Sequence, residues 1–321
     1  MSLPSFESIY GQPALWKSLK QGFENGSAVH AFLFVGDRGS GKRTAALVCA
    51  AAVLCEGADK PCGACKACKQ VFEGVHPDLV RLGAEGASSI GIAVVRSLQE
   101  TMRTKPYESK RRAILLEDAQ LLTQDAQNAL LKTLEEPQEG NVLFLLCSQL
   151  EGLLPTVQSR CRLVRMGRLS KEEMQRGLAD RGVPQERVEE LFAASGGNLG
   201  RALEMYADPD YARMAERCVG LLEGLRAPEE LPAALDSLKD MEKDRQLRLA
   251  FLEAMELLCQ RLLRRSLGLP DCGGSALPRR DFTSERIHSM MDAIVWARKR
   301  LNANISWAAA VEPLLKRIIG G

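Results

Sequence analysis

The strongest constraint on the fold is a glycine-rich loop between an apolar run and a helical pattern. The apolar run covers residues 31–35, the helical pattern covers 43–54, and the loop reads Gly36-Asp37-Arg38-Gly39-Ser40-Gly41-Lys42. Loops of this kind bind phosphate, because their glycines let backbone N–H groups surround the anion and their lysine reaches the terminal phosphates. A tight turn without a ligand is the alternative. The candidate phosphate-binding residues are Gly36, Gly39, Ser40, Gly41 and Lys42.

The sequence around this loop predicts alternating strands and helices. Apolar runs at 78–82, 113–116, 142–147 and 162–166 are typical of strands, with helical patterns at 92–102 and 124–134 between them. Such alternation indicates an α/β domain whose mostly parallel sheet is covered by helices on both faces. From about residue 168 the strand pattern stops. Short helices are predicted at 171–181, 185–194 and 198–206, the first with a capping box formed by Ser170 and Glu173, and long amphipathic helices over 211–321.

We therefore predict an α/β domain over 1–167, a small helical domain over 168–208 and a larger all-α domain over 209–321. Forty-three basic and 41 acidic residues leave a net charge of +2, which argues against tight DNA binding by this chain alone. The sequence contains no apolar run of the ~18 residues that span a bilayer. Its first residues have neither a basic start nor an apolar core, so we expect a cytoplasmic protein.

The residue after Lys42 departs from the pattern of a catalytic phosphate loop. Catalytic loops have serine or threonine there, because the hydroxyl binds Mg²⁺, whereas this chain has Arg43. Thr44 follows one residue later, about 100° further round a helix, and is not expected to face the same metal. The departure is compatible with phosphate binding and weakens the case for metal-assisted hydrolysis.

An acidic pair, Glu117-Asp118, follows the predicted strand 113–116. ATPases with this kind of loop place Asp before Glu, the first for Mg²⁺ and the second to activate water. Side chains alternate along a strand, so the reversed order puts the longer acid where the shorter one belongs. A misplacement of about 1 Å can cost two orders of magnitude in rate. A weakened nucleotide site and a polar strand end without function remain equal alternatives.

Four cysteines have the spacing of a metal site. Cys55, Cys62, Cys65 and Cys68 form the pattern C-x6-C-x2-C-x2-C, which suits one tetrahedral Zn²⁺. Because four thiolates leave no open coordination position, such a zinc is structural; free thiols are the alternative. His76 lies too far along the chain to be needed as a ligand. The other six cysteines are scattered and are expected in the core or on the surface: Cys49, Cys147, Cys161, Cys218, Cys259 and Cys272.

Several strings resemble the bacterial clamp-loader family of AAA+ proteins. The cysteine module is inserted after the phosphate-loop helix as in that family, and Gly11-Gln12 resembles its segment beside the adenine pocket. The run 128–137, which reads NALLKTLEEP, is nearly a family signature, and Ser159-Arg160-Cys161 matches the arginine-finger motif. The resemblance is strong over 1–208; beyond that it rests on 298–315, including Leu301-Asn302-Ala303-Asn304. It implies an AAA+ domain, a small helical lid and an all-α collar for oligomerisation.

The departures from the family pattern indicate the kind of member. Motor subunits of the family have Lys-Thr in the phosphate loop, Asp-Glu after the strand, and an arginine in the lid that senses the γ-phosphate. This sequence has Arg43, the reversed acids, and Gly200 at the position of that arginine, with Arg201 one residue late. Arg160 is retained. The combination resembles a subunit that lends its arginine finger to a neighbour.

The resemblance implies a scaffold subunit of the DNA polymerase III holoenzyme with little or no ATPase activity of its own. Arg160 would act in trans on the ATP of a tau/gamma subunit. Tau/gamma and delta subunits would complete a hetero-oligomeric ring that loads the sliding clamp on primed DNA during replication. Whether ATP or ADP binds near Lys42 stays open. An ATP-hydrolysing motor subunit of the same loader and a different AAA+ nucleic-acid machine are the competing interpretations.

For Arg160 and for three basic tracts, a purely structural interpretation stands beside the functional one. Spacing alone favours a surface or salt-bridged Arg160. The basic tracts 110–112, 264–265 and 298–300 are most often solvated faces, and DNA contact is the alternative.

Overall fold

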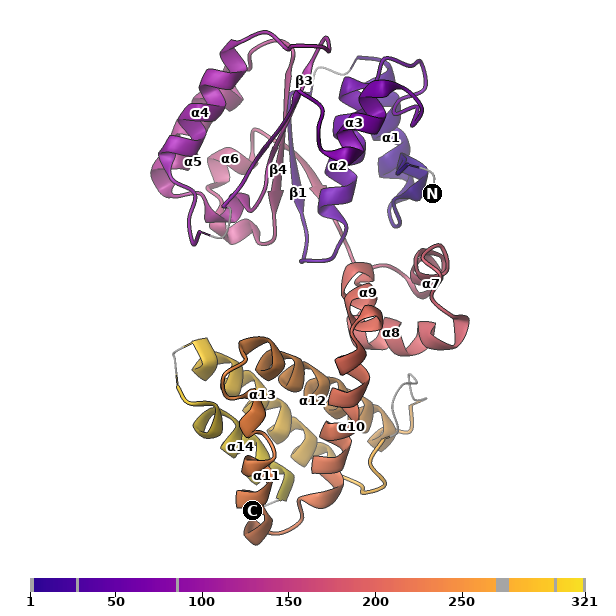
Figure 1. Cartoon of the computed structure of the whole chain (residues 1–321), viewed down its shortest axis with the longest axis vertical. Helices are drawn as coiled ribbons and strands as arrows, with labels where there is room; N and C mark the ends of the chain where they lie inside the picture. Colours follow the sequence, from indigo (N-terminus) through magenta and orange to yellow (C-terminus); the bar gives the residue numbers. More distant parts are fainter. Residues whose placement is uncertain (1–2, 27–28, 85–86, 270–276, 303–304, 320–321) are drawn as a thin grey trace. The chain divides into compact units, whose positions relative to one another are not determined.

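The computed structural model describes residues 3–26, 29–84, 87–269, 277–302 and 305–319, without the side chains of 209–212 and 302 (Figure 1). Contacts divide the chain into two compact units. The first comprises Met1–Gly177 with Gly197–Arg201, and the second comprises Leu178–Gly196 with Ala202–Gly321. The three-domain division at 167/168 and 208/209 stays a prediction. Cys272 and Ala303-Asn304 lie outside the described residues.

The first unit contains a five-stranded, fully parallel sheet in the order β2-β3-β4-β1-β5. Its strands are β1 (Ala31–Val35), β2 (Leu79–Leu82), β3 (Arg112–Leu116), β4 (Asn141–Cys147) and β5 (Arg162–Arg165). All predicted strands are present, within a residue or so of their predicted bounds. Because parallel strands end at one edge of the sheet, the loop after β1 and the acidic pair after β3 lie at the same edge, with β4 between them.

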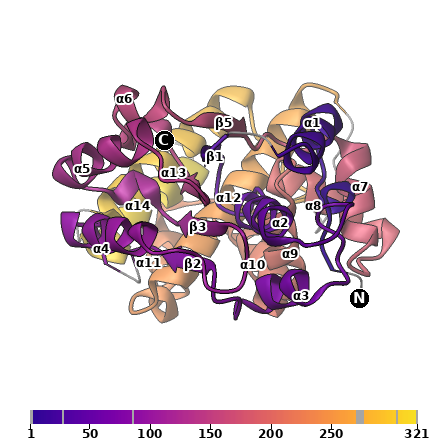
Figure 2. The ribbon, with the colours of Figure 1, turned by 90° about the horizontal axis from the view of Figure 1, so that it is seen from above.

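Helices cover both faces of this sheet (Figures 1 and 2). One face carries α1 (Pro13–Glu24), α2 (Lys42–Leu54) and α3 (Lys66–Glu73); the other carries α4 (Ile92–Arg103), α5 (Gln124–Glu135) and α6 (Pro155–Gln158). Strand β1 contributes to both cores by alternation: Phe32 and Phe34 pack with the first set, and Leu33 packs with the second. Burial on both faces explains why the strands read as continuous apolar runs.

Helix α7 (Lys171–Ala179) begins with the predicted capping box. The Glu173 backbone N–H donates to Ser170 Oγ at 3.2 Å, and the Ser170 N–H donates to Glu173 Oε2 at 2.9 Å. These two bonds satisfy N–H groups that have no partner inside the helix. The capping box is confirmed.

The second unit is helical. It contains α8 (Val188–Ser195), most of α9 (Leu199–Ala207), α10 (Pro209–Gly224), α11 (Leu231–Asp236), α12 (Arg245–Ser266), α13 (Ser284–Asn302) and α14 (Trp307–Ile319). One apolar core joins α10 to α14. At its centre Phe251 meets Trp307 edge-to-face at 5.8 Å, and the Trp307 indole N–H donates to the Leu238 carbonyl at 3.1 Å. The predicted fold class, an α/β domain followed by helical regions, is confirmed.

No helix in the described part of the chain is both long and apolar enough to cross a membrane.

Candidate functional site

The phosphate loop joins β1 to α2, as predicted. Gly39 and Gly41 have φ of +81° and +86°, a left-handed conformation that glycine adopts without steric cost. Helix α2 begins at Lys42, whose Nζ donates to the Asp37 carbonyl of the same loop at 3.0 Å. Burial lowers the pKa of Lys42, and nearby Asp118, Cys147 and Asp37 oppose this shift. The lysine therefore faces its own loop.

A small cavity adjoins the loop. Its volume is about 160 Å³, below the roughly 300–1,000 Å³ of most ligand pockets. Ser40 Oγ is buried here without a hydrogen-bond partner among the described residues. The lining consists of Gly36, Asp37, Ser40, Met166, Gly167, Arg168 and Asn198.

The segment Gly197–Arg201 lies directly against the loop. Asn198 Nδ2 donates to the Arg38 carbonyl at 2.8 Å, and the Gly200 N–H donates to the Gly39 carbonyl at 2.9 Å. A Cβ added to Gly200 would lie 2.5 Å from Gly39 Cα, which is closer than non-bonded carbons approach. Gly200 therefore occupies a position where no side chain fits.

Arg43 pairs with Glu117, a contact that the sequence did not predict. Its Nη2 lies 2.6 Å from Glu117 Oε2 and 2.8 Å from Oε1, and its Nε lies 3.0 Å from Oε1. Arg81 Nη2 reaches Oε1 at 3.0 Å from β2. Bidentate arginine–carboxylate pairing is strong and directional. Both oxygens of Glu117 are thus engaged by arginines, and one of these arginines, Arg43, directly follows Lys42 of the loop.

The other acid leaves the strand. β3 ends at Leu116, and Asp118 has a φ of 53° in the left-handed region. Strand alternation, which we used to compare the two acids, therefore does not extend to Asp118. Asp118 is exposed, and its Oδ1 accepts a hydrogen bond from Gln120 Nε2 at 3.3 Å. Thr44, on α2, is exposed as well. The two acids differ in both backbone conformation and partners.

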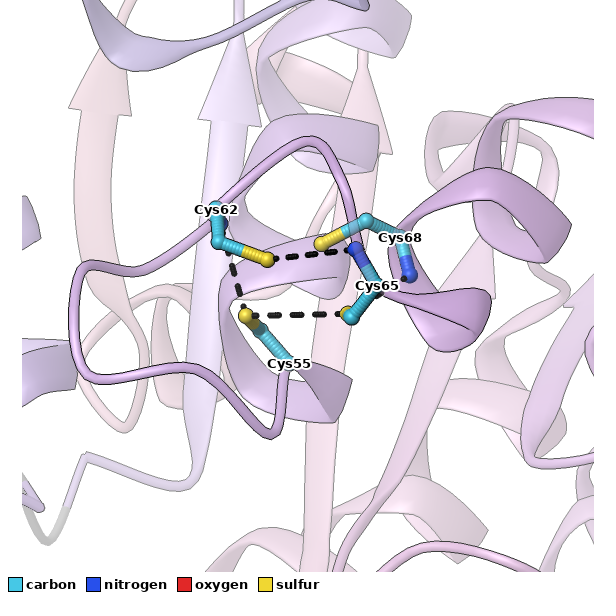
Figure 3. Close-up of side chains that lie close together, drawn as sticks. All are labelled: Cys55, Cys62, Cys65 and Cys68. Atoms are coloured by element: carbon cyan, nitrogen blue, oxygen red, sulfur yellow. Dashed lines mark hydrogen bonds between the residues drawn. The ribbon is translucent and has the colours of Figure 1, made fainter.

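The four cysteines of the predicted metal site lie together between α2 and α3 (Figure 3). All four sulfurs lie within 4.8 Å of one another, and Cys65 Sγ and Cys55 Sγ are 4.0 Å apart. A tetrahedral Zn²⁺ with Zn–S bonds of about 2.3 Å needs sulfurs roughly 3.8 Å apart. His76 does not join the group: its ring accepts from the Asp78 N–H and contacts Ser109 Oγ. The cluster is at metal-binding distance.

Backbone N–H groups around the sulfurs suit thiolate ligands. The N–H groups of Gly57 and Cys62 point to Cys55 Sγ at 3.3 and 3.4 Å. Hydrogen bonds from the backbone of Ala64 and Cys65 lower the pKa of Cys62 to about 6. Burial raises the pKa of Cys55 and of Cys68, and a bound cation would favour their thiolate forms.

The remaining described cysteines do not form a second cluster. Cys49, Cys147, Cys218 and Cys259 are buried in the apolar cores, and Cys161 is half-buried. These positions agree with the expectation of core or surface residues.

Arg160 lies between α6 and the edge strand β5. Its Nη2 forms an ion pair with Glu135 Oε1 at 2.6 Å, and its Nη1 donates to the Thr156 carbonyl at 3.0 Å. The side chain is 36% exposed. The salt-bridged arginine that spacing alone favoured is thus present, at the position of the arginine-finger motif.

Gln127 is a buried polar residue near the candidate site that the sequence analysis did not single out. It is 4% exposed, and its Nε2 donates to the carbonyls of Leu122 at 3.0 Å and Gly152 at 2.9 Å, while its Oε1 accepts from the Leu154 N–H at 2.7 Å. It links the segment after the acidic pair to the segment that leads to Arg160. The available signal was a polar residue on the apolar stripe of α5, with Leu130 and Leu134.

All three basic tracts contain arginines held by contacts within the chain. In the tract 264–265, Arg265 donates to the carbonyls of Pro278 and Arg280, both at 2.8 Å. Arg112 is buried, and its guanidinium donates to the carbonyls of Thr101, Thr104 and Lys105. Arg298 pairs with Glu256 at 2.6 Å. The expectation of a solvated face was therefore wrong for Arg112, because its donors hold the loop before β3.

Comparison with known proteins identifies the family. Residues 11–170 match the family described as DNA polymerase III, delta subunit. Over 317 residues, 95% of both chains, the sequence is 28% identical to DNA polymerase III subunit delta' of Bacillus subtilis. Over 194 residues, 58% of both chains, it is 39% identical to the delta' subunit of Pseudomonas aeruginosa. The chain belongs to the delta-prime family of clamp-loader subunits. The family membership predicted from the sequence motifs is confirmed.

A solved structure supports the fold assignment. The structure of a DNA polymerase III gamma subunit-related protein from Thermotoga maritima has a TM-score of 0.53, covering 94% of this chain and 98% of that one. Its sequence identity of 18% shows the fold alone.

Proposed function

We propose that this chain is a non-hydrolysing scaffold subunit of the DNA polymerase III clamp loader, which supplies Arg160 to the ATP of a neighbouring tau/gamma subunit. The observation that carries the proposal is the ion pair between Arg43 and Glu117. It occupies, within the chain, the place where a motor subunit binds Mg²⁺. A delta-prime-type role follows, because the finger motif is retained while the chain's own nucleotide site is altered.

Three contacts support the absence of hydrolysis. Glu117 is paired with two arginines, so its carboxylate is compensated and is no free metal ligand. Lys42 Nζ donates a hydrogen bond to the Asp37 carbonyl. Gly200 lies against Gly39, so the position proposed for the sensing arginine carries no side chain. Phosphoryl transfer depends on precise positioning and on a metal ion that neutralises developing charge. The pairing of Lys42 and Glu117 within the chain supports the proposal that this subunit does not hydrolyse ATP.

The role of Arg160 follows from the chemistry of phosphoryl transfer. Charge develops on the γ-phosphate oxygens in the transition state, and a guanidinium from a neighbouring chain stabilises it by ~10³–10⁵ in rate where measured in other systems. Arg160 is partly exposed and precedes the edge strand β5. That position is compatible with contact to a second chain. Gln127 would keep the backbone around α6 in register with α5.

We assign a structural Zn²⁺ to Cys55, Cys62, Cys65 and Cys68. The metal would join the end of α2 to the start of α3, and when bound it supplies cross-linking rather than reactivity. The α10–α14 core would form the collar, with tau/gamma and delta subunits as partners in the ring. Contact with the sliding clamp and primed DNA would occur through the assembly, in the cytoplasm.

The test compares Arg160 variants in a reconstituted loader. We expect Arg160→Ala to lower hydrolysis at the adjacent ATP site by roughly 10³-fold or more, measured as phosphate release in the presence of clamp and primed DNA, while size-exclusion chromatography shows normal assembly. Arg160→Lys should give partial activity, because it keeps the charge without the planar fork. Arg165→Ala is the matched control: it removes an exposed arginine from the neighbouring strand and should keep full activity. Unchanged turnover with Arg160→Ala would refute the proposal.

A further inference from the structure

The resting contact of Arg160 carries a second inference. Glu135 is the last residue of α5, and Arg160 follows α6, so the pair joins two helices on the same face of the sheet. Both terminal nitrogens of the guanidinium are engaged within the chain, Nη2 by the Glu135 carboxylate at 2.6 Å and Nη1 by the Thr156 carbonyl at 3.0 Å. The end of the arginine that would meet a phosphate is turned onto its own subunit.

We propose that Glu135 is a latch for Arg160: its carboxylate holds the guanidinium in an inactive position and releases it to the phosphate of a neighbouring subunit. The proposal rests on the function proposed above for Arg160. Glu135 is a positioning residue here, because it acts only through the arginine. No covalent bond is made or broken; the guanidinium exchanges one anionic partner for another.

Charge and exposure make this exchange feasible in both directions. A carboxylate in direct contact compensates the positive charge that an arginine finger uses, so the arginine cannot give its full effect while it is paired. The side chains of Arg160 and Glu135 are 36% and 50% exposed. Exposed ion pairs are weak, whereas a triphosphate carries more charge than a carboxylate and offers oxygens in the geometry that arginine prefers. The neighbour's γ-phosphate can therefore displace Glu135 as charge develops on its oxygens in the transition state.

Two roles of Glu135 predict opposite changes in turnover when its charge is removed. If Glu135 competes with the phosphate, removal of its charge raises turnover. If Glu135 instead holds the finger in its working orientation, removal lowers turnover. We expect Glu135→Gln, which keeps the side-chain length, to raise kcat of the reconstituted loader by about two- to fivefold, the range open to an exposed ion pair. KM for ATP should change little, because the finger acts on the transition state.

Two further variants separate the latch from a structural effect. Glu136→Gln removes an exposed carboxylate one residue later and should leave kcat unchanged. The double variant Glu135→Gln/Arg160→Ala should have the rate of Arg160→Ala alone, because the latch has nothing left to release. A structural effect of the substitution would persist in the double variant and would appear in thermal melting.

The outcomes distinguish this proposal from the proposed function. If Arg160→Ala lowers turnover but Glu135→Gln leaves kcat unchanged or lowers it, the latch is wrong and the finger stands. If Arg160→Ala leaves turnover unchanged, the finger itself is wrong. A rise in kcat for Glu135→Gln that also occurs in the Arg160→Ala background would overturn the latch, since the effect would not pass through the arginine.

Discussion

At the scale of single residues, the proposed loss of hydrolysis rests on Arg43 and Gly200. Arg43 directly follows Lys42, and Glu117 and Arg81 complete a compact ion-pair group around it. Gly200 has no side chain and lets its backbone touch that of Gly39. The two residues lie on different helices, α2 and α9, so substitution of one leaves the contact of the other in place.

The Gly39–Gly200 contact predicts a stability effect. Gly200→Ala should lower the free energy of unfolding by about 1–3 kcal/mol, because the new methyl group would overlap the Gly39 backbone at 2.5 Å from Cα. Chemical denaturation followed by circular dichroism measures the change. Gly167→Ala is the matched control: its Cβ would meet nothing within 4 Å, so we expect a change within about 0.5 kcal/mol. Equal stability of the Gly200→Ala protein would show that the contact is not close.

At the scale of elements, α2 and α3 meet at the four cysteines. The segment between them, residues 56–64, has little apolar content, whereas α2 itself is almost wholly buried. The apolar core therefore holds α2 in place, and the cysteine cluster holds the connection to α3. Because α2 does not depend on the metal, a bound metal contributes only part of the stability of this region.

Metal removal tests the assignment of a structural zinc and its contribution to stability. The purified chain should contain one zinc per molecule, and its removal by a chelator should lower the stability of the first unit by about 2–5 kcal/mol, well below the ~10–16 kcal/mol for isolated zinc-finger peptides, because α2 keeps its core contacts. Metal analysis and thermal melting are the measurements. Cys62→Ser should lose the metal, and Cys161→Ser should retain it. Zinc-free protein with unchanged melting would contradict the assignment.

The elements themselves were predictable from the sequence, and some contacts were not. Buried parallel strands and amphipathic helices leave periodic apolar patterns, so β1 and α5 were placed almost to the residue. The cysteine cluster was predictable because its ligands are close in sequence. The Arg43–Glu117 pair joins positions 74 residues apart, and local patterns contain no information on such a partner. The Glu135–Arg160 pair and the buried Gln127 depend in the same way on how α5 packs against α6.

At the scale of the whole molecule, the function proposed above is divided between two chains. In that proposal the loop around Lys42 stays closed by contacts within this chain, whereas Arg160 acts on a phosphate that another chain binds. Under this proposal, activity depends on assembly.

The isolated chain should therefore release phosphate from ATP only at background rate, with or without Mg²⁺. Arg43→Thr alone should not restore hydrolysis, because Arg81 still pairs with Glu117 and Gly200 still lies against Gly39. Steady-state phosphate release by the purified chain is the measurement, and Lys42→Ala identifies contamination, since turnover that survives this substitution comes from another protein. Mg²⁺-dependent turnover that Lys42→Ala abolishes would show that the site works despite Arg43, and the chain would then be a motor subunit.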